Sequence, residues 1–365
     1  MVALKEQHGS TEIVSVGAVE TASPSASASA SASASAASKK QFKWSVASID
    51  SAFKFDHSVA TGATNLAAID WSEDNVLGIE RADKGSEGLF FVQTRVGGAL
   101  VVKRSKAIGS EIFCTLLALR LGIAAPFARI VVTTAPDGIA MLSTLNRKDV
   151  LGRVATTLYE QFYLILMQYQ RGVSFGAAGK ERMAAALADG EHVRQLGAIL
   201  ALDVLVNNVD RLPLIWDHQG NAGNVMLNER NQPISIDGQI VGLSAASGRA
   251  EYMARVAGLL RARQPERTRT AAAPQFGAVR SALRQHCHVD IGVAGELQLE
   301  DGFWSIVRRA AGGESISGEL TQWVGLLARF EPALSDLPQI QVDFVDEVWS
   351  LFAKAGGDLE PKSEV

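Results

Sequence analysis

The first half of the chain has the hydrophobic pattern of β-strands. Its apolar residues come in short runs bounded by glycine, proline or polar residues, which is typical of strands. The predicted strands cover residues 89–92, 99–102, 130–132, 138–142 and 159–167. Gly97 and Gly98 predict a hairpin turn between the first two strands, and Pro136 begins the turn expected between the third and the fourth.

Helical periodicity dominates the second half. One helix is already expected earlier, at 111–121, with Ser110 as its N-cap and Gly122 as its stop. Beyond the strand region, apolar residues recur every three or four positions, which is the period of an amphipathic helix. The predicted helices cover residues 182–188, 192–206, 251–262, 276–286, 303–311, 316–330 and 344–355. A strand-rich half followed by a helix-rich half predicts an α+β protein with two lobes.

Composition divides the chain further. Serine and alanine alternate strictly from residue 25 to residue 36, and such small side chains bury too little surface to offset the entropy lost on ordering. No internal repeat of about 20–50 residues is visible. We therefore expect a disordered Ser/Ala-rich tail at 1–40, an N-lobe at 41–167, a C-lobe at 168–357 and a flexible C-terminus at 358–365.

Charge and hydropathy narrow the class of protein. The 365 residues are 47% hydrophobic, which is enough for a sizeable core, and the net charge of −4 argues against a general nucleic-acid binder. No apolar run reaches the roughly 18 residues of a membrane-spanning helix, and the N-terminus has no secretory or transit signal. Cys114 and Cys287 lack the neighbours that a zinc site would need. We therefore expect a cytoplasmic protein without a membrane span or nucleic-acid partner.

Three polar residues around one predicted hairpin carry the strongest chemical signal. Asp210 follows a predicted helix, while Asn224 and Asp237 flank the predicted hairpin 225–236 and should lie at the same edge of it. Phosphoryl transfer to a hydroxyl needs a carboxylate near the nucleophile and oxygen ligands for the magnesium ions that bind the phosphates. Any one of these residues alone would indicate a turn or a helix cap. Together they favour a kinase site, with Asn221 as the alternative to Asn224.

The segment that holds these residues resembles a known family. The runs NNVDRLPLIWDHQGNAGNVML and ISID are similar to the catalytic and metal-binding segment of the actin-fragmin kinases, and they also resemble the phosphatidylinositol kinase pattern. The resemblance implies a two-lobed protein-kinase-like fold, with Asp210 as the catalytic residue and with Asn224 and Asp237 as metal ligands. It also implies that ATP and Mg²⁺ are bound and that a protein, with actin as the family's example, is the substrate.

Residues upstream are candidates for binding the nucleotide. Gly85, Ser86 and Gly88 form a small-residue loop before a strand, where backbone N–H groups can approach phosphates. Lys103, on the next strand, has the place of the kinase lysine that contacts the ATP phosphates, and Glu111 is its expected ion-pair partner. The alternatives are an ordinary turn for the loop and, for Glu111, a favourable interaction with the helix dipole.

Two further segments have candidate roles. Residues 166–172 fit the hinge between the lobes, where an extended backbone can bind adenine, and a buried strand is the alternative. Met167, Gln168 and Tyr169 are the candidate contacts within this segment. The arginine-rich segment 249–269 could bind an acidic protein surface or anionic lipid, although a solvated helix is the commoner meaning of such a run.

The sequence therefore predicts an ATP-dependent atypical Ser/Thr protein kinase. A phosphoinositide-type lipid kinase and a nucleotide-binding pseudokinase scaffold are the alternatives. Asn-Val-Asp stands where ordinary protein kinases have His-Arg-Asp, and no Ala-Pro-Glu segment follows Asp237. We therefore do not expect regulation by an ordinary phosphorylated activation loop.

Overall fold

The computed structural model describes most of the chain after residue 65. The described residues are 66–82, 88–217, 220–243, 245–263, 269–313, 315–327 and 337–358, without the side chains of 337–341. The predicted tail at 1–40, the loop residues Gly85 and Ser86, and 359–365 lie outside them.

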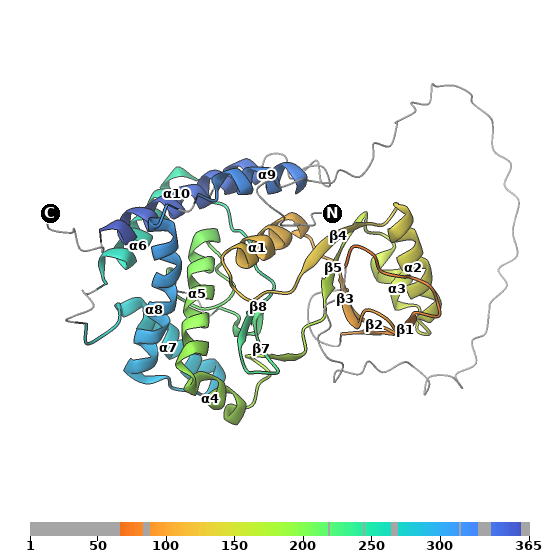
Figure 1. The fold of residues 1–365 in the computed structure, drawn as a ribbon, viewed down its shortest axis with the longest axis horizontal. Helices are drawn as coiled ribbons and strands as arrows, with labels where there is room; N and C mark the ends of the chain where they lie inside the picture. Colours follow the sequence, from red (N-terminus) through yellow and green to blue (C-terminus); the bar gives the residue numbers. More distant parts are fainter. Residues whose placement is uncertain are drawn as a thin grey trace, which may run out of the picture. The chain divides into compact units, whose positions relative to one another are not determined.

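A five-stranded antiparallel sheet forms the first part of the described chain (Figure 1). Its strands are β1 (Val76–Arg81), β2 (Leu89–Thr94), β3 (Ala99–Lys103), β4 (Ala128–Val132) and β5 (Tyr163–Gln168). Their spatial order is β1-β2-β3-β5-β4. The predicted β2–β3 hairpin is confirmed, and Gly97 and Gly98 occupy its turn at φ values of 106° and 79°. These positive φ values explain why the turn contains glycine.

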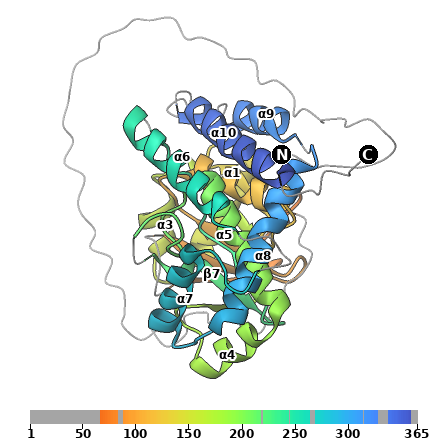
Figure 2. The same cartoon turned by 90° about the vertical axis from the view of Figure 1, so that its left-hand side faces the viewer.

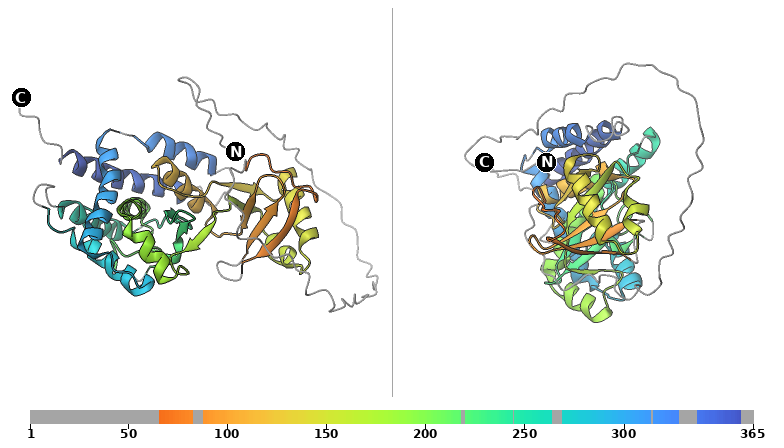
Figure 3. Two further views of the ribbon diagram at one scale, coloured as in Figure 1. Left: turned by 60° about the horizontal axis from the view of Figure 1, so that its bottom comes forward. Right: turned by 90° about the vertical axis from the view of Figure 1, so that its right-hand side faces the viewer.

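The strand predicted at 138–142 is wrong. These residues belong to helix α2 (Pro136–Lys148), and Pro136 lies in its first turn after the extended Ala135. Proline suits this place because its missing N–H would have no helical partner there. Met141, Leu142 and Leu145 are buried at helical spacing. With α3 (Arg153–Leu158), α2 covers one face of the sheet (Figure 3).

Helix α1 (Ile108–Arg120) starts before the predicted position. Ser110 is buried in its first turn and does not cap it, because its Oγ accepts the N–H of Ile240 at 2.6 Å. The stop at Gly122 is confirmed, since this residue has a φ of 69°. The N–H of Ile123 then donates to the oxygen of Ala118 at 2.8 Å, which closes the helix end.

The part after β5 is mainly helical. It contains β6 (Gly172–Ser174), α4 (Lys180–Ala188), α5 (Gly190–Val206), the 3₁₀ turn Ala222–Asn224, β7 (Val225–Asn228), β8 (Pro233–Ser235), α6 (Ala246–Arg261), α7 (Pro274–Cys287), α8 (Gly292–Ala311), α9 (Ser317–Leu327) and α10 (Leu337–Gly357). Each predicted helix is present within the described residues, although several bounds differ. The structure thus confirms the α+β fold with a strand-rich N-lobe and a helical C-lobe. None of the described helices is long and apolar enough to cross a membrane.

Two glycines let α5 and α8 pack closely side by side (Figure 2). A Cβ at Gly197 would lie 2.0 Å from the backbone oxygen of Leu299, and a Cβ at Gly302 would lie 1.8 Å from that of Arg194. No side chain fits at these distances, so the contact requires glycine. The crossing fixes α5, whose C-terminal end leads to Asp210.

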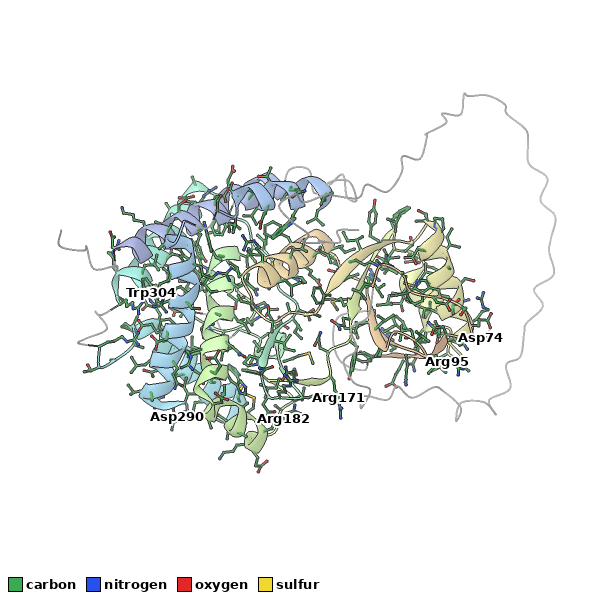
Figure 4. All side chains as sticks on the ribbon, viewed as in Figure 1. Asp74, Arg95, Arg171, Arg182, Asp290 and Trp304 are labelled. Atoms are coloured by element: carbon green, nitrogen blue, oxygen red, sulfur yellow. The ribbon has the colours of Figure 1, made fainter. Side chains whose placement is uncertain are left out.

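Several of the described arginines of the segment 249–269 make contacts within the protein. Arg249 pairs with Glu347 at 2.7 Å, and Arg269 contacts Glu300 at 3.0 Å. The guanidinium of Arg263 lies 4.5 Å from the ring centre of Trp304, which is labelled in Figure 4. These contacts favour a structural role for these arginines.

Candidate active site

Lys103 lies at the centre of a largely buried ionic cluster. Its Nζ is 2.8 Å from Glu111 Oε2 and 2.7 Å from Asp237 Oδ1. Lys103 ends β3, Glu111 lies in α1, and Asp237 follows β8. The lysine and glutamate side chains are 5% and 8% exposed, whereas that of Asp237 is 40% exposed. The expected Lys103–Glu111 ion pair is therefore present, and Asp237 joins it.

The cluster shifts the pKa values of both buried members. Burial by itself lowers the pKa of Lys103, but attraction to Asp237 and Glu111 outweighs this effect and raises the pKa above its usual 10.5. Burial raises the pKa of Glu111 above its usual 4.5, and the nearby Lys103 and the hydrogen bond with Ser105 offset only part of this shift. Lys103 is therefore a firmly held cation, and the charge on Glu111 depends on it.

Asp210 and Asn224 contact each other directly. Asn224 Nδ2 donates to Asp210 Oδ2 at 3.0 Å and to the backbone oxygen of Asp210 at 2.8 Å. Asn221 Nδ2 donates to Asn224 Oδ1 at 3.2 Å. Asn224 is thus the residue beside Asp210, and Asn221 lies behind it. This arrangement favours Asn224 over Asn221 as the candidate metal ligand.

The predicted hairpin brings Asn224 close to Asp237. Strands β7 and β8 are paired as expected, with Val225 opposite Ser235, and the N–H of Ile236 donates to the oxygen of Asn224 at 3.2 Å. Asn224 and Asp237 therefore lie at the same edge of the hairpin.

Two further features shape this hairpin. Arg182, labelled in Figure 4, donates to the oxygen of Asn228 at 2.9 Å and so supports the far turn. Asp237 itself has a φ of 49°, which is uncommon for a residue with a Cβ. Such conformations cluster at functional sites.

Arg211, which the sequence analysis missed, is fully buried behind these residues. Its Nε donates to the backbone oxygen of Asn224 at 3.1 Å. Its Nη2 donates to Ser235 Oγ and to the oxygen of Ile236, both at 2.9 Å, and its Nη1 contacts Asp203 Oδ1. An aspartate in the otherwise apolar end of α5 was the sequence signal that could have revealed this pair.

Asp203 is buried beside the chain that leads to Asp210. Burial raises the pKa of Asp203 to about 6, although the charge of Arg211 and the hydrogen bond from Asn208 favour its ionised form. Asn208 Nδ2 donates to Asp203 Oδ1 at 2.9 Å, and Asn208 Oδ1 accepts the N–H of Asp210 at 3.2 Å. These contacts tie the loop before Asp210 to α5.

A cavity of about 420 Å³ adjoins the ionic cluster. Its wall includes Glu111 and Asp237, so the charged groups lie at its side. The apolar part of its lining includes Leu89, Phe91, Val101, Ile165, Met226 and Ile236. A largely apolar cavity with a few convergent polar groups is typical of a small-molecule site. Gly88 is not among its lining residues; it lies before β2 with a φ of 106°.

The predicted hinge residues Met167, Gln168 and Tyr169 all line this cavity. However, the N–H groups of Gln168 and Tyr169 already donate to the oxygens of Phe127 and Ala99, at 2.9 and 3.1 Å. The next N–H along the chain is that of Gln170, which also lines the cavity. Gln170, which lies within the predicted hinge segment 166–172, is therefore the better candidate donor.

The side-chain oxygens of Asn224 and Asp237 are of the chemical type that binds magnesium. Mg²⁺ prefers oxygen ligands and is usually held by one or two carboxylates together with substrate phosphates and water. Among the described residues, no group of three or more His, Cys, Asp and Glu side chains could hold a metal. Asn224 and Asp237 would therefore supply only part of the ligand set, and phosphate and water would have to supply the rest.

Comparison with known proteins identifies the family. Residues 48–240 match the family described as "Actin-fragmin kinase, catalytic", which is more than half of the chain. The chain belongs to this family. A Dictyostelium discoideum protein named "Putative actin-fragmin kinase" is 26% identical over 166 residues, which cover 42% of this chain and 39% of that protein. The chain thus matches well under half the length of this relative.

Proposed function

We propose that this member of the actin-fragmin kinase catalytic family is an ATP- and Mg²⁺-dependent atypical Ser/Thr protein kinase. The observation that carries the proposal is the contact of Lys103 with both Glu111 and Asp237 at the wall of the cavity. Kinases use a strand lysine, a helix glutamate and a metal-binding aspartate together at the ATP phosphates. A structural ion pair would not need to adjoin a largely apolar cavity.

The cavity accommodates the nucleotide in this proposal. The adenine ring lies between the apolar side chains of Val101 and Met226, and the backbone N–H of Gln170 donates a hydrogen bond to the edge of the ring. Lys103 then holds the phosphates, while Glu111 keeps the lysine in place. Gly85, Ser86 and Gly88 remain our candidates for a loop over the phosphates; the first two lie outside the described residues.

Asp210 acts on the acceptor hydroxyl. Its Oδ2 is held by Asn224, so we assign Oδ1 to the hydroxyl, which it orients. Asp210 takes the hydroxyl proton as the new oxygen–phosphorus bond forms, while the bond from the γ-phosphorus to the β–γ bridging oxygen breaks and ADP leaves. Asn224 and Asp237 would hold Mg²⁺, which supplies neutralising charge at the phosphates. The protein's own contribution is to position these groups before the substrates arrive.

The family and the name of the relative support a proposal for the class of molecule that accepts the phosphate. We propose a protein hydroxyl as acceptor, with actin as the first candidate, and a cytoplasmic location. We also propose lobes at 41–167 and 168–357, joined by the hinge.

A phosphate-transfer assay tests the function. The full chain is incubated with γ-labelled ATP and Mg²⁺, in separate reactions with actin, with a generic Ser/Thr substrate and with phosphoinositide vesicles. The proposal predicts label on a protein, which Asp210→Asn abolishes. Label on lipid alone would change the acceptor to a phosphoinositide, and Mg²⁺-dependent ATP binding without any transfer would indicate a pseudokinase.

A further inference from the structure

The pair formed by Arg211 and Asp203 lies next to every group assigned to phosphoryl transfer in the C-lobe. The guanidinium binds the backbone oxygen of Asn224 and that of Ile236, the residue before Asp237. Asp203 binds Asn208, whose side chain in turn accepts the N–H of Asp210. The pair thus reaches three separate chain segments through directed bonds.

The geometry points to a positioning role for this pair: we propose that Arg211 and Asp203 set the relative places of Asp210, Asn224 and Asp237, and thereby build the magnesium site. The proposal rests on the proposed function. Neither side chain is assigned a contact with substrate, so both act through the residues that they hold.

Burial gives the first reason to assign this role. Arg211 is 0% and Asp203 is 5% exposed, and a buried ion pair is weak evidence of stabilisation, since apolar residues of similar volume often serve stability as well or better. What the pair does supply is a set of hydrogen bonds with fixed directions. Asp203 Oδ2 has no hydrogen-bond partner among the described residues, but Arg211 Nε, Nη1 and Nη2 each have at least one, and buried directed bonds of this kind favour one arrangement of the groups that they join.

The shape of the guanidinium gives the second reason. Arg211 uses three different nitrogens for its four partners, which lie in α5, before β7 and around the end of β8. A lysine carries one nitrogen on a flexible stem and cannot reproduce this planar set of bonds. Arg211→Lys should therefore keep the charge and lose the positioning.

A matched control exists in the same lobe. Arg269 and Glu300 also form a buried pair, with side chains that are 11% and 1% exposed and an Nη1–Oε2 distance of 3.0 Å. The partners of this pair lie in the helical core around α8 and include none of the residues assigned to the reaction.

The experiment compares Asp203→Asn/Arg211→Met with Arg269→Met/Glu300→Gln in the full chain. The three measurements are thermal unfolding, binding of a non-hydrolysable ATP analogue with and without Mg²⁺, and kcat as a function of Mg²⁺ concentration. The double variant at the Arg211 pair should lose the Mg²⁺-dependent gain in nucleotide affinity and about 10- to 100-fold in kcat, as supporting residues of metal sites do. Affinity without Mg²⁺ should stay within about threefold.

The control double variant should change unfolding only. Unchanged Mg²⁺ dependence and kcat in the Arg211 double variant would overturn the inference, as would equal losses in both double variants. If the double variant does not fold, Arg211→Lys gives the same comparison with the charge retained. Wild-type protein that neither transfers phosphate nor gains nucleotide affinity from Mg²⁺ would instead refute the proposed function.

Discussion

Replacing Lys103 by methionine removes the cation from the ionic cluster and keeps a side chain of similar length. Glu111, whose side chain is 8% exposed, loses its partner at 2.8 Å, and Asp237 loses its partner at 2.7 Å. Breaking a buried pair by removing one member costs about 3–5 kcal/mol. We expect the lower end, about 3 kcal/mol, because Asp237 is 40% exposed to solvent and Glu111 can take up a proton.

The loss of kcat in Lys103→Met should be larger than partial unfolding of the variant can explain. Charge stabilisation by one fixed donor at a transferring group contributes on the order of 10²- to 10³-fold in rate. We therefore expect a loss of this size in kcat for phosphate transfer, measured well below the unfolding temperature of the variant. Thermal unfolding of the same samples should show the lower stability. Lys354→Met, at an exposed position of α10, is the control and should change neither quantity.

The result that would refute this reasoning is specific. If Lys103→Met keeps kcat within about threefold of the wild type, the lysine does not hold the phosphates. If its unfolding temperature is also unchanged, the ionic cluster contributes nothing measurable to the fold.

Three other predictions follow from the packing and burial of single residues. Gly197→Ala should lower the free energy of unfolding by about 1–3 kcal/mol, because the added Cβ would lie 2.0 Å from a backbone oxygen of α8. Gly258→Ala, whose Cβ would have nothing within 4 Å, should raise the free energy of unfolding by about 0.5–1 kcal/mol. Urea titration measures both changes. Because burial raises the pKa of Glu111, the folded state binds more protons than the unfolded state between pH 4.5 and that raised pKa. The contribution of Glu111 to the free energy of unfolding therefore falls as the pH rises through this window. Glu111→Gln should remove this pH dependence of the free energy of unfolding, which unfolding curves measured across the window would show. Burial raises the pKa of Cys287 to about 11 and that of Cys114 further, so iodoacetamide at pH 8 should label neither thiol in the folded protein and both in urea; rapid labelling of the folded protein would contradict their burial.

Local rules were sufficient where a short segment determines its own shape. The pair Gly97-Gly98 marked the β2–β3 hairpin, and Gly122 marked the end of α1, because only a positive φ fits these places. The hairpin after Asn224 followed from two apolar runs with a turn between them. Lys103, Glu111, Asn224 and Asp237 lie on these elements or directly beside them, which explains why sequence reasoning could group them.

Long-range partners explain the errors. The apolar run at 138–142 was compatible with a strand or a helix, and packing against the sheet, which is not visible in a short run, determined the helix. Serine is a residue type that often caps helices, but the hydrogen-bond partner of Ser110 is Ile240, 130 positions away. Likewise, strand pairing occupies the N–H groups of Gln168 and Tyr169, and no spacing rule gives that pairing.

The most direct test of the central claim is a Mg²⁺ titration of γ-phosphate transfer with Asp237→Ala. Asp343→Ala, at an exposed position of α10, serves as the control. The proposed site predicts that the wild type and the control transfer phosphate with the same Mg²⁺ dependence, and that Asp237→Ala is inactive at every Mg²⁺ concentration while still folded. Transfer by Asp237→Ala at the wild-type rate and with the wild-type Mg²⁺ dependence would contradict the account.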